Sequence, residues 1–572
     1  MAADVGARRR AVVGPGRAVR RVGNVVDGAM SGLNIADIFE TVVATVPDRT
    51  ALIVRSGDGH DELRFSFAEL DARVNRLAHA LAAVGIGEGD HVGCHLYDGN
   101  QYVEVTLAAY KLRAVPINVN FRYVDDELRY LFDNADLRMV FTEPDLEERS
   151  ARAAATLGWP CPVVVADERY EQLLSGQPAT APDVGDRSPD DRYALWTGGT
   201  TGMPKGVMWR QEDIYLSAIG GNGNVLLGIE AVKDLDDVAA RARAVSPLPG
   251  TLTLCPLMHG GGFWLAFSAI LSGSFSVLIR DVGFDPAFAC QVINEERVSL
   301  LMTIGDAYAR PIVDLLESCG PDDYDLSSLL VYGSGGAILS PSVKDDLARL
   351  LPHTFVHDGF GASETGGQGR LIGTGADGAP RFDMDATNVV IADDGTLCRP
   401  GDGRVGMLAN SGQIPLGYYK DEAKTAATFP VIDGVRYAMP GDLASVDADG
   451  SIAVYGRGSV SINSGGEKIF PEEVEKALKR HPAVFDATVV GTPNERFGQQ
   501  VTAVVELRPE HADVPPGLSE LQDHCREHLA GYKVPRAVVF VDDTVRSPSG
   551  KPDYRWAKQT ALAGLADAAE DA

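Results

Sequence analysis

The sequence predicts an α/β fold: a large N-terminal domain of two α/β subdomains plus a β-rich subdomain, followed by a small, mobile α+β C-terminal domain. Three observations lead to this expectation. The chain has 572 residues, and at roughly 150 residues per domain this allows about four compact units. From about Asn34, helical patterns alternate with short apolar runs, which is typical of largely parallel sheets. Beyond about Thr387, shorter strands are separated by Asp-Gly turns, which favours a β-rich subdomain.

The alternating region contains a helix pattern at residues 70–78 and a strand pattern at residues 90–96. Further strands are expected at 139–142, 162–165, 300–303 and 329–332. The uncharged stretch from Ala244 to Ile279 contains three prolines and a Gly-Gly-Gly run, which a single membrane helix tolerates poorly. We therefore expect a buried strand, a glycine loop and a buried helix there.

A compact α+β pattern follows Gly456. Pro471 opens a helix in which Glu475 and Lys479 have the spacing of an ion pair on one face. Strand-like runs then occur at 487–490, 501–507 and 537–541. We predict a basic, disordered extension at 1–29 that carries six arginines and two acids, an N-terminal ATP- and acyl-binding domain at 30–456, a hinge at 457–460 and a C-terminal lid domain at 461–572.

The charge balance constrains the partners of the protein. The formal net charge is 52 − 80 = −28, which opposes binding to nucleic acid or to anionic lipid. We expect small-molecule substrates, no nucleic acid and no integral membrane association. The seven cysteines are scattered and never form a C-x-x-C pair, which predicts reduced thiols in a cytoplasmic protein. The sequence leaves the oligomeric state open, with a homodimer among the alternatives.

The most informative segment is the Gly/Thr-rich run at 197–206, which ends in Lys205 and Gly206 and follows a strand-like stretch. Glycines let backbone N–H groups approach phosphate oxygens, and a lysine neutralises their charge. The loop is not a Walker A motif, because Ser or Thr does not follow the lysine. The pattern alone does not decide between a phosphate-binding loop and a flexible surface turn.

A second segment at 360–366 holds one acid, Glu364, among small residues. A carboxylate in this setting suits Mg²⁺ that bridges nucleotide phosphates, although an ordinary loop acid explains it too. Upstream, Gly335 and Gly336 follow an apolar run and either give a flat ring access to the backbone or form a tight strand-to-helix turn.

Together these segments resemble the adenylate-forming superfamily, which includes acyl-CoA synthetases, peptide-synthetase adenylation domains and beetle luciferases. The resemblance extends from about Met30 over nearly the whole chain. It rests on six ordered motifs at 197–206, 360–364, 441–442, 456–457, 464–475 and 547–551. It implies an enzyme, an AMP-forming acid–thiol ligase that uses ATP, Mg²⁺ and CoA.

The resemblance also implies a role for each matching residue. Catalysis is expected from Lys551, Glu364 and Lys205, and Mg²⁺ binding from Thr200 and Glu364. ATP is expected on Thr197, Gly198, Gly199, Thr200, Thr201, Gly202, Lys205, Gly335, Gly336, Ser363, Asp442, Arg457 and Lys551. CoA is expected on Ser464, Gly465, Gly466, Glu467 and Lys468, and the hinge at Ser459, where the family usually has Asp or Lys.

The implied reaction has two halves. A carboxylate attacks the α-phosphorus of ATP and forms an acyl-adenylate, and catalysis there consists mainly of positioning and charge neutralisation. The C-terminal domain then rotates, the Lys551 loop withdraws, and the 464–468 loop builds a tunnel for the attacking thiol.

The longer stretches at 119–124, 206–215, 456–468 and 551–558 resemble the actinobacterial ligases that attach CoA to the C26 carboxylate of the cholesterol side chain. The acyl pocket is then expected at His259, Gly260, Gly305 and Gly333, with His259 either a gate or a packed polar residue. A medium- or long-chain fatty acyl-CoA ligase is the main alternative, since it uses the same catalytic set. A carrier-protein-loading module and a non-catalytic nucleotide-binding protein fit less well.

Overall fold

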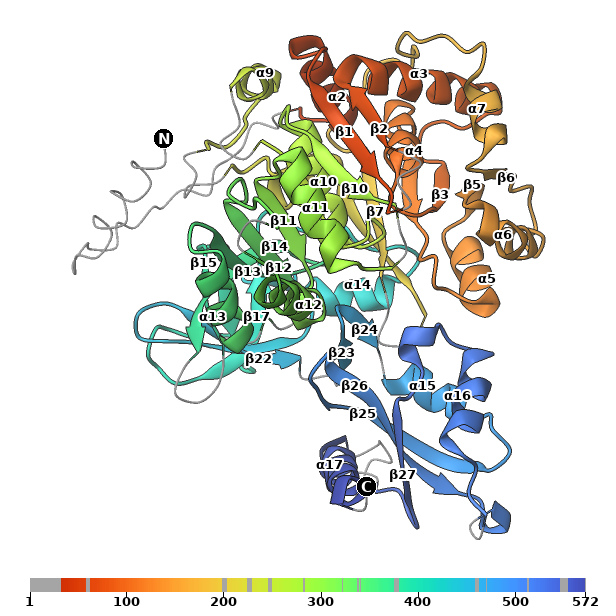
Figure 1. The fold of residues 1–572 in the computed structure, drawn as a ribbon, viewed down its shortest axis with the longest axis vertical. Coiled ribbons are helices and arrows are strands. Elements are labelled where there is room, and N and C mark those ends of the chain that lie inside the picture. The colour runs from red at the N-terminus through yellow and green to blue at the C-terminus, as the bar shows by residue number, and fades with distance from the viewer. Residues whose placement is uncertain are drawn as a thin grey trace. The chain divides into compact units, whose positions relative to one another are not determined.

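The computed structural model describes residues 32–57, 62–197, 203–223, 229–244, 249–280, 283–320, 323–336, 339, 341–374, 380–457, 462–469, 471–511, 514–545 and 554–570. The expected extension at 1–29 and the expected hinge residue Ser459 lie outside these ranges. The described chain folds into mixed α/β layers, as the sequence predicts (Figure 1).

A mixed sheet of 13 strands forms the centre of the large domain within the described residues. In spatial order the strands are β16 (Asn388–Ile391), β17 (Val405–Asn410), β21 (Asp442–Val446), β22 (Ile452–Arg457), β15 (Pro380–Met384), β14 (Gly366–Thr374), β13 (Phe355–Ala362), β12 (Val331–Gly335), β11 (Leu300–Thr303), β9 (Thr251–Thr253), β10 (Ser276–Ile279), β1 (Thr50–Arg55) and β2 (Leu63–Ser66). The six neighbouring strands from β13 to β1 in this order are parallel, and the strands on either side of them pair antiparallel.

The β-rich region expected beyond Thr387 therefore continues the large sheet. Its strands β16, β17, β21 and β22 extend the parallel part through the antiparallel strands β14 and β15. Apolar residues of β16, β17, β21 and β22 form a small core together with Phe382 of β15. The Asp-Gly turns thus predict the change in local architecture but not its attachment to the parallel strands.

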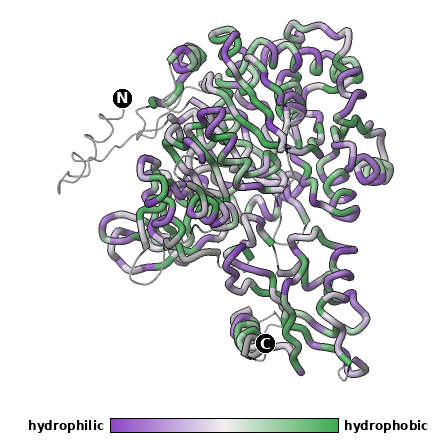
Figure 2. The backbone as a smooth tube through the Cα atoms, viewed as in Figure 1, coloured by the Kyte–Doolittle hydropathy of each residue, from purple (hydrophilic) through white to green (hydrophobic). Residues whose placement is uncertain are grey.

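A second, fully parallel sheet has the order β4 (Val115–Asn118), β3 (His91–His95), β5 (Leu137–Thr142) and β6 (Val163–Val165). Its helices are α3 (Phe67–Ala83), α4 (Asn100–Lys111), α5 (Asp125–Asn134), α6 (Glu147–Ala154) and α7 (Glu168–Leu174). The predicted helix at 70–78 lies inside α3, which begins with a capping box between Ser66 and Glu69. Along these outer helices hydrophilic and hydrophobic residues alternate (Figure 2).

The uncharged stretch forms the predicted buried strand and buried helix, but the predicted glycine loop is wrong, because the Gly-Gly-Gly run is the first turn of the helix. It contains β9, the buried helix α10 (Gly260–Leu271) and β10. Helices α11 (Pro286–Glu296), α12 (Gly305–Ser318) and α13 (Pro341–Leu350) follow and pack with the parallel strands in one apolar core (Figure 1). In the part of the chain that the structure describes, no helix combines the length and the hydropathy that crossing a membrane requires.

The C-terminal region has a separate sheet of five strands. These are β24 (Glu467–Ile469), β23 (Ile462–Ser464), β26 (Gly498–Leu507), β25 (Val484–Asn494) and β27 (Ala537–Val541), with helices α15 (Pro471–Leu478), α16 (Leu518–Arg526) and α17 (Tyr554–Glu570). The expected helix at Pro471 and the three expected strands are confirmed. The predicted pair of Glu475 and Lys479 is not formed, because Lys479 binds Asp486 and Glu475 accepts a hydrogen bond from the Val489 backbone N–H.

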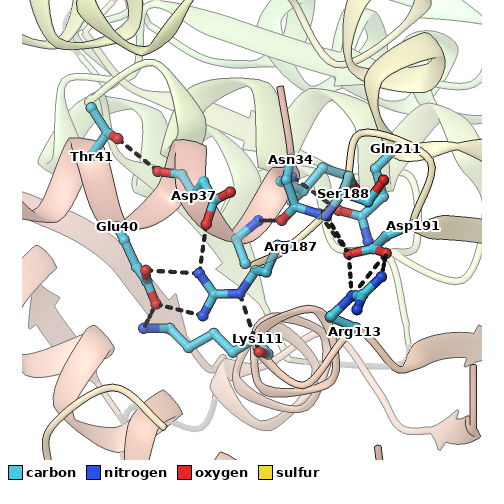
Figure 3. Close-up of polar contacts among 12 residues, drawn as sticks. Asn34, Asp37, Glu40, Thr41, Lys111, Arg113, Arg187, Ser188, Asp191 and Gln211 are labelled. Carbon is cyan, nitrogen blue, oxygen red and sulfur yellow. Dashed lines mark hydrogen bonds and ion pairs between the residues drawn. The ribbon is translucent and has the colours of Figure 1, made fainter. Parts of the chain in front are cut away.

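A polar cluster connects α2 (Ile35–Thr45) to the end of α4 and to the segment at 187–191 (Figure 3). The Lys111 ammonium is fully buried and lies 2.7 Å from both Glu40 and Asp71. Arg187 binds Glu40 as well, at 2.9 Å. Burial acts to raise the pKa of Glu40, but Arg187 and Lys111 together lower it below its usual value. The cluster therefore consists of charges that stabilise one another away from water.

We expect Lys111→Met to destabilise the large domain by about 1–3 kcal/mol, because the fully buried ammonium is lost and the partly exposed Glu40 and Asp71 each keep one partner fewer. The midpoint of urea unfolding should fall accordingly. Arg129→Met is the matched control, since Arg129 forms a partly exposed ion pair with Asp126 at 3.0 Å, and its loss should change stability by about 1 kcal/mol or less. Equal midpoints for the two variants would contradict this account of the cluster.

Candidate functional site

Two antiparallel strands hold the ends of the glycine loop. Thr197 ends β7 (Arg192–Thr197), Lys205 begins β8 (Lys205–Arg210), and the two residues are partners in the strand register. Asn118 fixes the end of β7, since its side chain accepts from the Trp196 N–H at 2.7 Å and donates to the Trp196 carbonyl at 2.8 Å. The two strands therefore pair antiparallel up to Thr197 and Lys205, and residues 198–202 lie outside the described chain.

The same small sheet brings Glu364 towards Lys205. Strand β18 (Gly417–Tyr418) pairs with β8, and the Tyr418 hydroxyl donates to the buried Glu364 carboxylate at 2.8 Å. On β8 the indole N–H of Trp209 donates to the Ser363 carbonyl at 3.1 Å. Two residues that lie 159 positions apart in the sequence thus share one site, as the motif resemblance implies.

The charge of Lys205 is poised close to neutral pH. Burial and the neighbouring Lys424 lower the pKa of the Lys205 ammonium to about 8, while Asp421 and Glu364 act in the opposite direction. Lys424 lies in the first turn of α14 (Glu422–Thr428). The N-cap residue Asp421 accepts a hydrogen bond from the Lys424 backbone N–H. A bound polyanion would favour the charged form of Lys205.

Asp442 and Arg457, both expected to bind ATP, lie opposite each other on two paired strands. Asp442 begins β21, Arg457 ends β22, and the two are register partners in that antiparallel pair. Asp442 is buried. Gly335 and Gly336, which are expected to bind ATP, lie at the end of β12. Gly336 has φ +79°, and the space into which a side chain would project is open. Gly336 is thus the position at which a flat ring can approach the backbone.

The expected acyl-pocket glycines lie around Met302 of β11. A Cβ on Gly333 would come within 3.2 Å of the Met302 sulfur, and a Cβ on Gly335 within 3.2 Å of its methyl group. Gly305 begins α12 with φ +52° and donates to the Ser334 hydroxyl at 2.9 Å. Gly260 begins α10 beside Trp264. The structure therefore places Gly333 and Gly335 beside Met302, and the hydrogen bond to Ser334 holds Gly305 next to the same strand.

The expected CoA loop is a tight hairpin. Strands β23 and β24 pair Ser464 with Glu467, so Gly465 and Gly466 are the two turn residues, with φ +59° and +87°. Turns of this kind require positive φ at both positions, which glycine adopts without strain. A Cβ on Gly466 would lie 2.0 Å from Cγ2 of Ile304, just before α12. Only a glycine turn lets the hairpin approach the large domain this closely.

Glu467 joins the hairpin to the large domain. Its Oε1 accepts from Arg122 at 2.9 Å and contacts Nε2 of His259 at 3.1 Å. Burial acts to raise the pKa of Glu467, but His259 and Arg122 lower it below its usual value, so the carboxylate is charged. His259 is the N-cap residue of α10 and here faces the CoA loop.

A cleft of about 630 Å³, including its open mouth, begins beside this contact. Arg122 and Asp98 line it at the side of the hairpin, and burial raises the pKa of the Asp98 carboxyl to about 7. The opposite wall carries Arg280, which binds Glu143 at 3.0 Å. The other principal lining residues are Tyr97, Phe121, Phe284, Phe288 and Tyr308. The cleft therefore offers aromatic faces together with two guanidinium groups.

Several expected site residues cannot be placed. Residues 198–202, the hinge residue Ser459 and Lys551 lie outside the described chain, and the side chains of Arg457 and Lys468 are not described. Sequence reasoning missed other residues of the site: Asp98, Asn118, Arg122, Tyr418 and Lys424. Arg122 stands in a stretch that the substrate resemblance includes, but no local pattern reveals its partner 345 residues away.

Two family models match the chain. The AMP-binding enzyme model matches residues 39–419, and the model of the AMP-binding enzyme C-terminal domain matches residues 473–551. The two matches cover most of the large domain and most of the C-terminal sheet.

Among curated relatives, a 3-oxocholest-4-en-26-oate–CoA ligase from Rhodococcus rhodochrous is 45% identical over 93% of this chain and 96% of its own length. A medium/long-chain-fatty-acid–CoA/3-oxocholest-4-en-26-oate–CoA ligase from Mycobacterium tuberculosis is 45% identical over 94% and 97%. The medium-chain acyl-CoA ligase Mig from Mycobacterium avium is 41% identical over 93% and 99%.

Two solved structures share the fold. The o-succinylbenzoate CoA synthetase MenE from Bacillus subtilis, bound with a product analogue, has a TM-score of 0.74 at 23% identity, over 91% of this chain and 98% of its own. The amide bond synthetase McbA from Marinactinospora thermotolerans has a TM-score of 0.73 at 22% identity, over 92% and 99%. The fold, the ordered motifs and these matches together identify the chain as a member of the AMP-binding enzyme family.

Proposed function

We propose that this protein is an ATP-dependent CoA ligase that activates a hydrophobic carboxylic acid through an acyl-adenylate. The observation that carries the proposal is the hairpin of Gly465 and Gly466, which contacts the large domain beside both the expected acyl wall and the open cleft. A second reacting group that enters through this cleft would reach the same site as the acid. The CoA ligases named among the relatives support this function.

In the first half-reaction, Lys205 and the glycine loop hold the phosphates of ATP, and Asp442 with Arg457 holds the ribose. The carboxylate of the acid attacks the α-phosphorus, pyrophosphate leaves, and the acyl-adenylate remains bound. Lys551 assists from the C-terminal domain by reaching the acid and the α-phosphate. The role of the protein is to align the two anions and to neutralise the charge that develops on phosphorus.

Glu364 has the chemistry of a Mg²⁺ ligand, since it offers hard carboxylate oxygens at a buried position that the Tyr418 hydroxyl orients. Thr200 would supply a hydroxyl from the glycine loop. When bound, Mg²⁺ supplies positive charge to the phosphate oxygens. Tyr418 keeps the Glu364 carboxylate directed towards the side of the site on which Lys205 lies.

In the second half-reaction, the thiol of CoA attacks the acyl carbonyl and AMP leaves. We assign the cleft beside Arg122 to CoA, because its aromatic faces suit the chain and its two arginines suit the phosphates of this anion. The hairpin at 464–468 then forms one wall of the path to the acyl group. Ser459 is the proposed hinge between the two arrangements.

The acid we propose is the C26 carboxylate of a cholesterol-derived side chain, which places the protein in steroid catabolism in the cytoplasm. The glycines expected in the acyl pocket, Gly260, Gly305 and Gly333, add no side chain to it, which suits a bulky hydrophobic group. Relatives named for 3-oxocholest-4-en-26-oate support this choice. A medium- or long-chain fatty acid is the second candidate, because other relatives also carry that activity in their names.

Purified protein incubated with Mg²⁺, ATP, CoA and an equimolar mixture of cholestenoate, shorter-side-chain steroid acids and C8 to C18 fatty acids should form cholestenoyl-CoA in preference to the other thioesters. Mass spectrometry of the CoA thioesters measures the ratio, and omission of ATP is the control. Preferential fatty acyl-CoA would contradict the steroid assignment and leave the ligase assignment intact. AMP release without any thioester would contradict CoA as the acceptor.

The pKa of Lys205 predicts a pH effect. Because the ammonium loses its proton near pH 8 in the absence of ligand, kcat/KM for ATP should fall as the pH rises through about 8. Lys424→Met removes a neighbouring positive charge, so the fall should move to higher pH. Lys420→Met is the control. Lys420 lies four residues before Lys424 but binds Asp136, so its loss should leave the profile in place. An unchanged profile in Lys424→Met would refute a phosphate-binding role for Lys205.

A further inference from the structure

A buried lysine joins the C-terminal sheet region to the large domain at a second point, away from Glu467. Lys533 ends the short helix η4 (Gly531–Lys533) and is 2% exposed. Its ammonium lies 2.6 Å from Oε1 of Glu127 and 2.8 Å from Oε2 of Glu473. Both carboxylates are buried, at 3% and 7% exposure. The three charges therefore form a triad that water hardly reaches.

The two acids belong to different parts of the chain. Glu127 lies in the first turn of α5 of the large domain, where its other oxygen accepts from the Val124 backbone N–H at 3.2 Å. Glu473 lies in α15 of the C-terminal region. Lys533 belongs to the same region, in η4. The bond between Lys533 and Glu473 is internal to the C-terminal region, whereas the bond to Glu127 exists only in an arrangement that brings the two regions together.

The surroundings keep the lysine charged. Nζ lies 5.3 Å from the ring centre of Tyr123 and 5.5 Å from that of Tyr532. Burial acts to lower the pKa of Lys533, but Tyr532, Glu473 and Glu127 raise it well above its usual value. A charged group at this depth tolerates few alternative positions, which is how buried ion pairs fix the register of packed elements.

The triad is coupled to the CoA loop through a short piece of chain. Helix α15, which carries Glu473, begins two residues after β24, which carries Glu467. The charge of Lys533 also contributes to lowering the pKa of Glu467. The segment from Glu467 to Glu473 is thus held to the large domain at both ends. Arg122 and His259 bind Glu467, and Lys533 links Glu473 to Glu127.

We propose that Lys533 is a positioning residue for thioester formation, which stabilises the domain arrangement of the second half-reaction by bridging Glu127 and Glu473. The inference rests on the proposed CoA ligase function. It makes Lys533 dispensable for adenylation, since the bridge to Glu127 is lost when the C-terminal domain rotates.

The test separates the two half-reactions in the full-length enzyme. ATP–pyrophosphate exchange measures adenylation, and single-turnover transfer from preformed acyl-adenylate to CoA measures thioester formation. Lys533→Met should slow transfer by about tenfold or more and leave exchange within about twofold, because the bond to Glu473 is lost in both arrangements and only the lost bridge to Glu127 is specific to one of them. Lys533→Arg should restore part of the transfer rate. Lys479→Met is the control, since Lys479 binds Asp486 within the C-terminal region and should affect neither step.

Glu127→Gln tests the same bridge from the large domain and leaves Lys533 paired with Glu473, so it carries the test if Lys533→Met does not fold. It should slow transfer selectively, and adding Lys533→Met to it should have little further effect. Equal slowing of both half-reactions, or unchanged transfer in Glu127→Gln, would overturn the proposal.

Small-angle X-ray scattering gives a readout that does not depend on catalysis. Lys533→Met and Glu127→Gln should share a scattering profile that differs from that of the wild type, because both populate other domain arrangements. Identical profiles for all three proteins would overturn the positioning role. A wild-type enzyme that forms no thioester with any acid would refute the proposed function. A profile that still differs from those of the variants would then show that the bridge fixes the domain arrangement without a role in thioester formation.

Discussion

The close approach of Gly466 to Ile304 is the constraint on which the arrangement of the site depends. The hairpin turn has no side chains at its two central positions, and a single added methyl group on Gly466 would overlap Ile304. Because the turn fits, Glu467 reaches Arg122 and His259 in the large domain. Because α15 begins two residues after the strand that carries Glu467, the bonds of Glu467 also fix the start of α15, where Glu473 binds Lys533. The contact of the two regions is thus built outward from a glycine turn.

The electrostatics of the site follow from the charge of the whole chain. A protein with a formal net charge of −28 binds anions only where local cations outweigh the global field. Two described arginines of the site bind an acid, Arg122 to Glu467 and Arg280 to Glu143, and Glu364 acts on Lys205 by raising its pKa. These pairs orient the cations before a ligand arrives, and they also limit non-specific attraction of polyanions. Acids elsewhere, such as Glu40 around Lys111, stabilise the framework.

The sequence predicts the layers and many of the elements because these depend on local patterns. The strand at 300–303 and the helix at Pro471 form where the patterns indicate, and Glu364 lies close enough to Lys205 to affect its pKa. The expected strand at 329–332 begins two residues later, at Val331, and includes Gly335. Local spacing fails where tertiary contacts compete, as when Lys479 prefers Asp486 on a neighbouring strand to Glu475 on its own helix. It also cannot pair residues as distant as Arg122 and Glu467 or Glu127 and Lys533.

The two half-reactions of the Gly466→Ala variant test the central claim most directly, namely that this turn builds the site of thioester formation. Gly498→Ala is the matched control, because Gly498 has φ +72° and no atom near the added methyl group, so it carries the backbone strain without the overlap. The account predicts that Gly466→Ala loses transfer to CoA and keeps ATP–pyrophosphate exchange, that Gly498→Ala keeps both, and that Ile304→Ala restores part of the transfer in the Gly466→Ala background. Normal transfer in Gly466→Ala, or loss of both steps together, would contradict it.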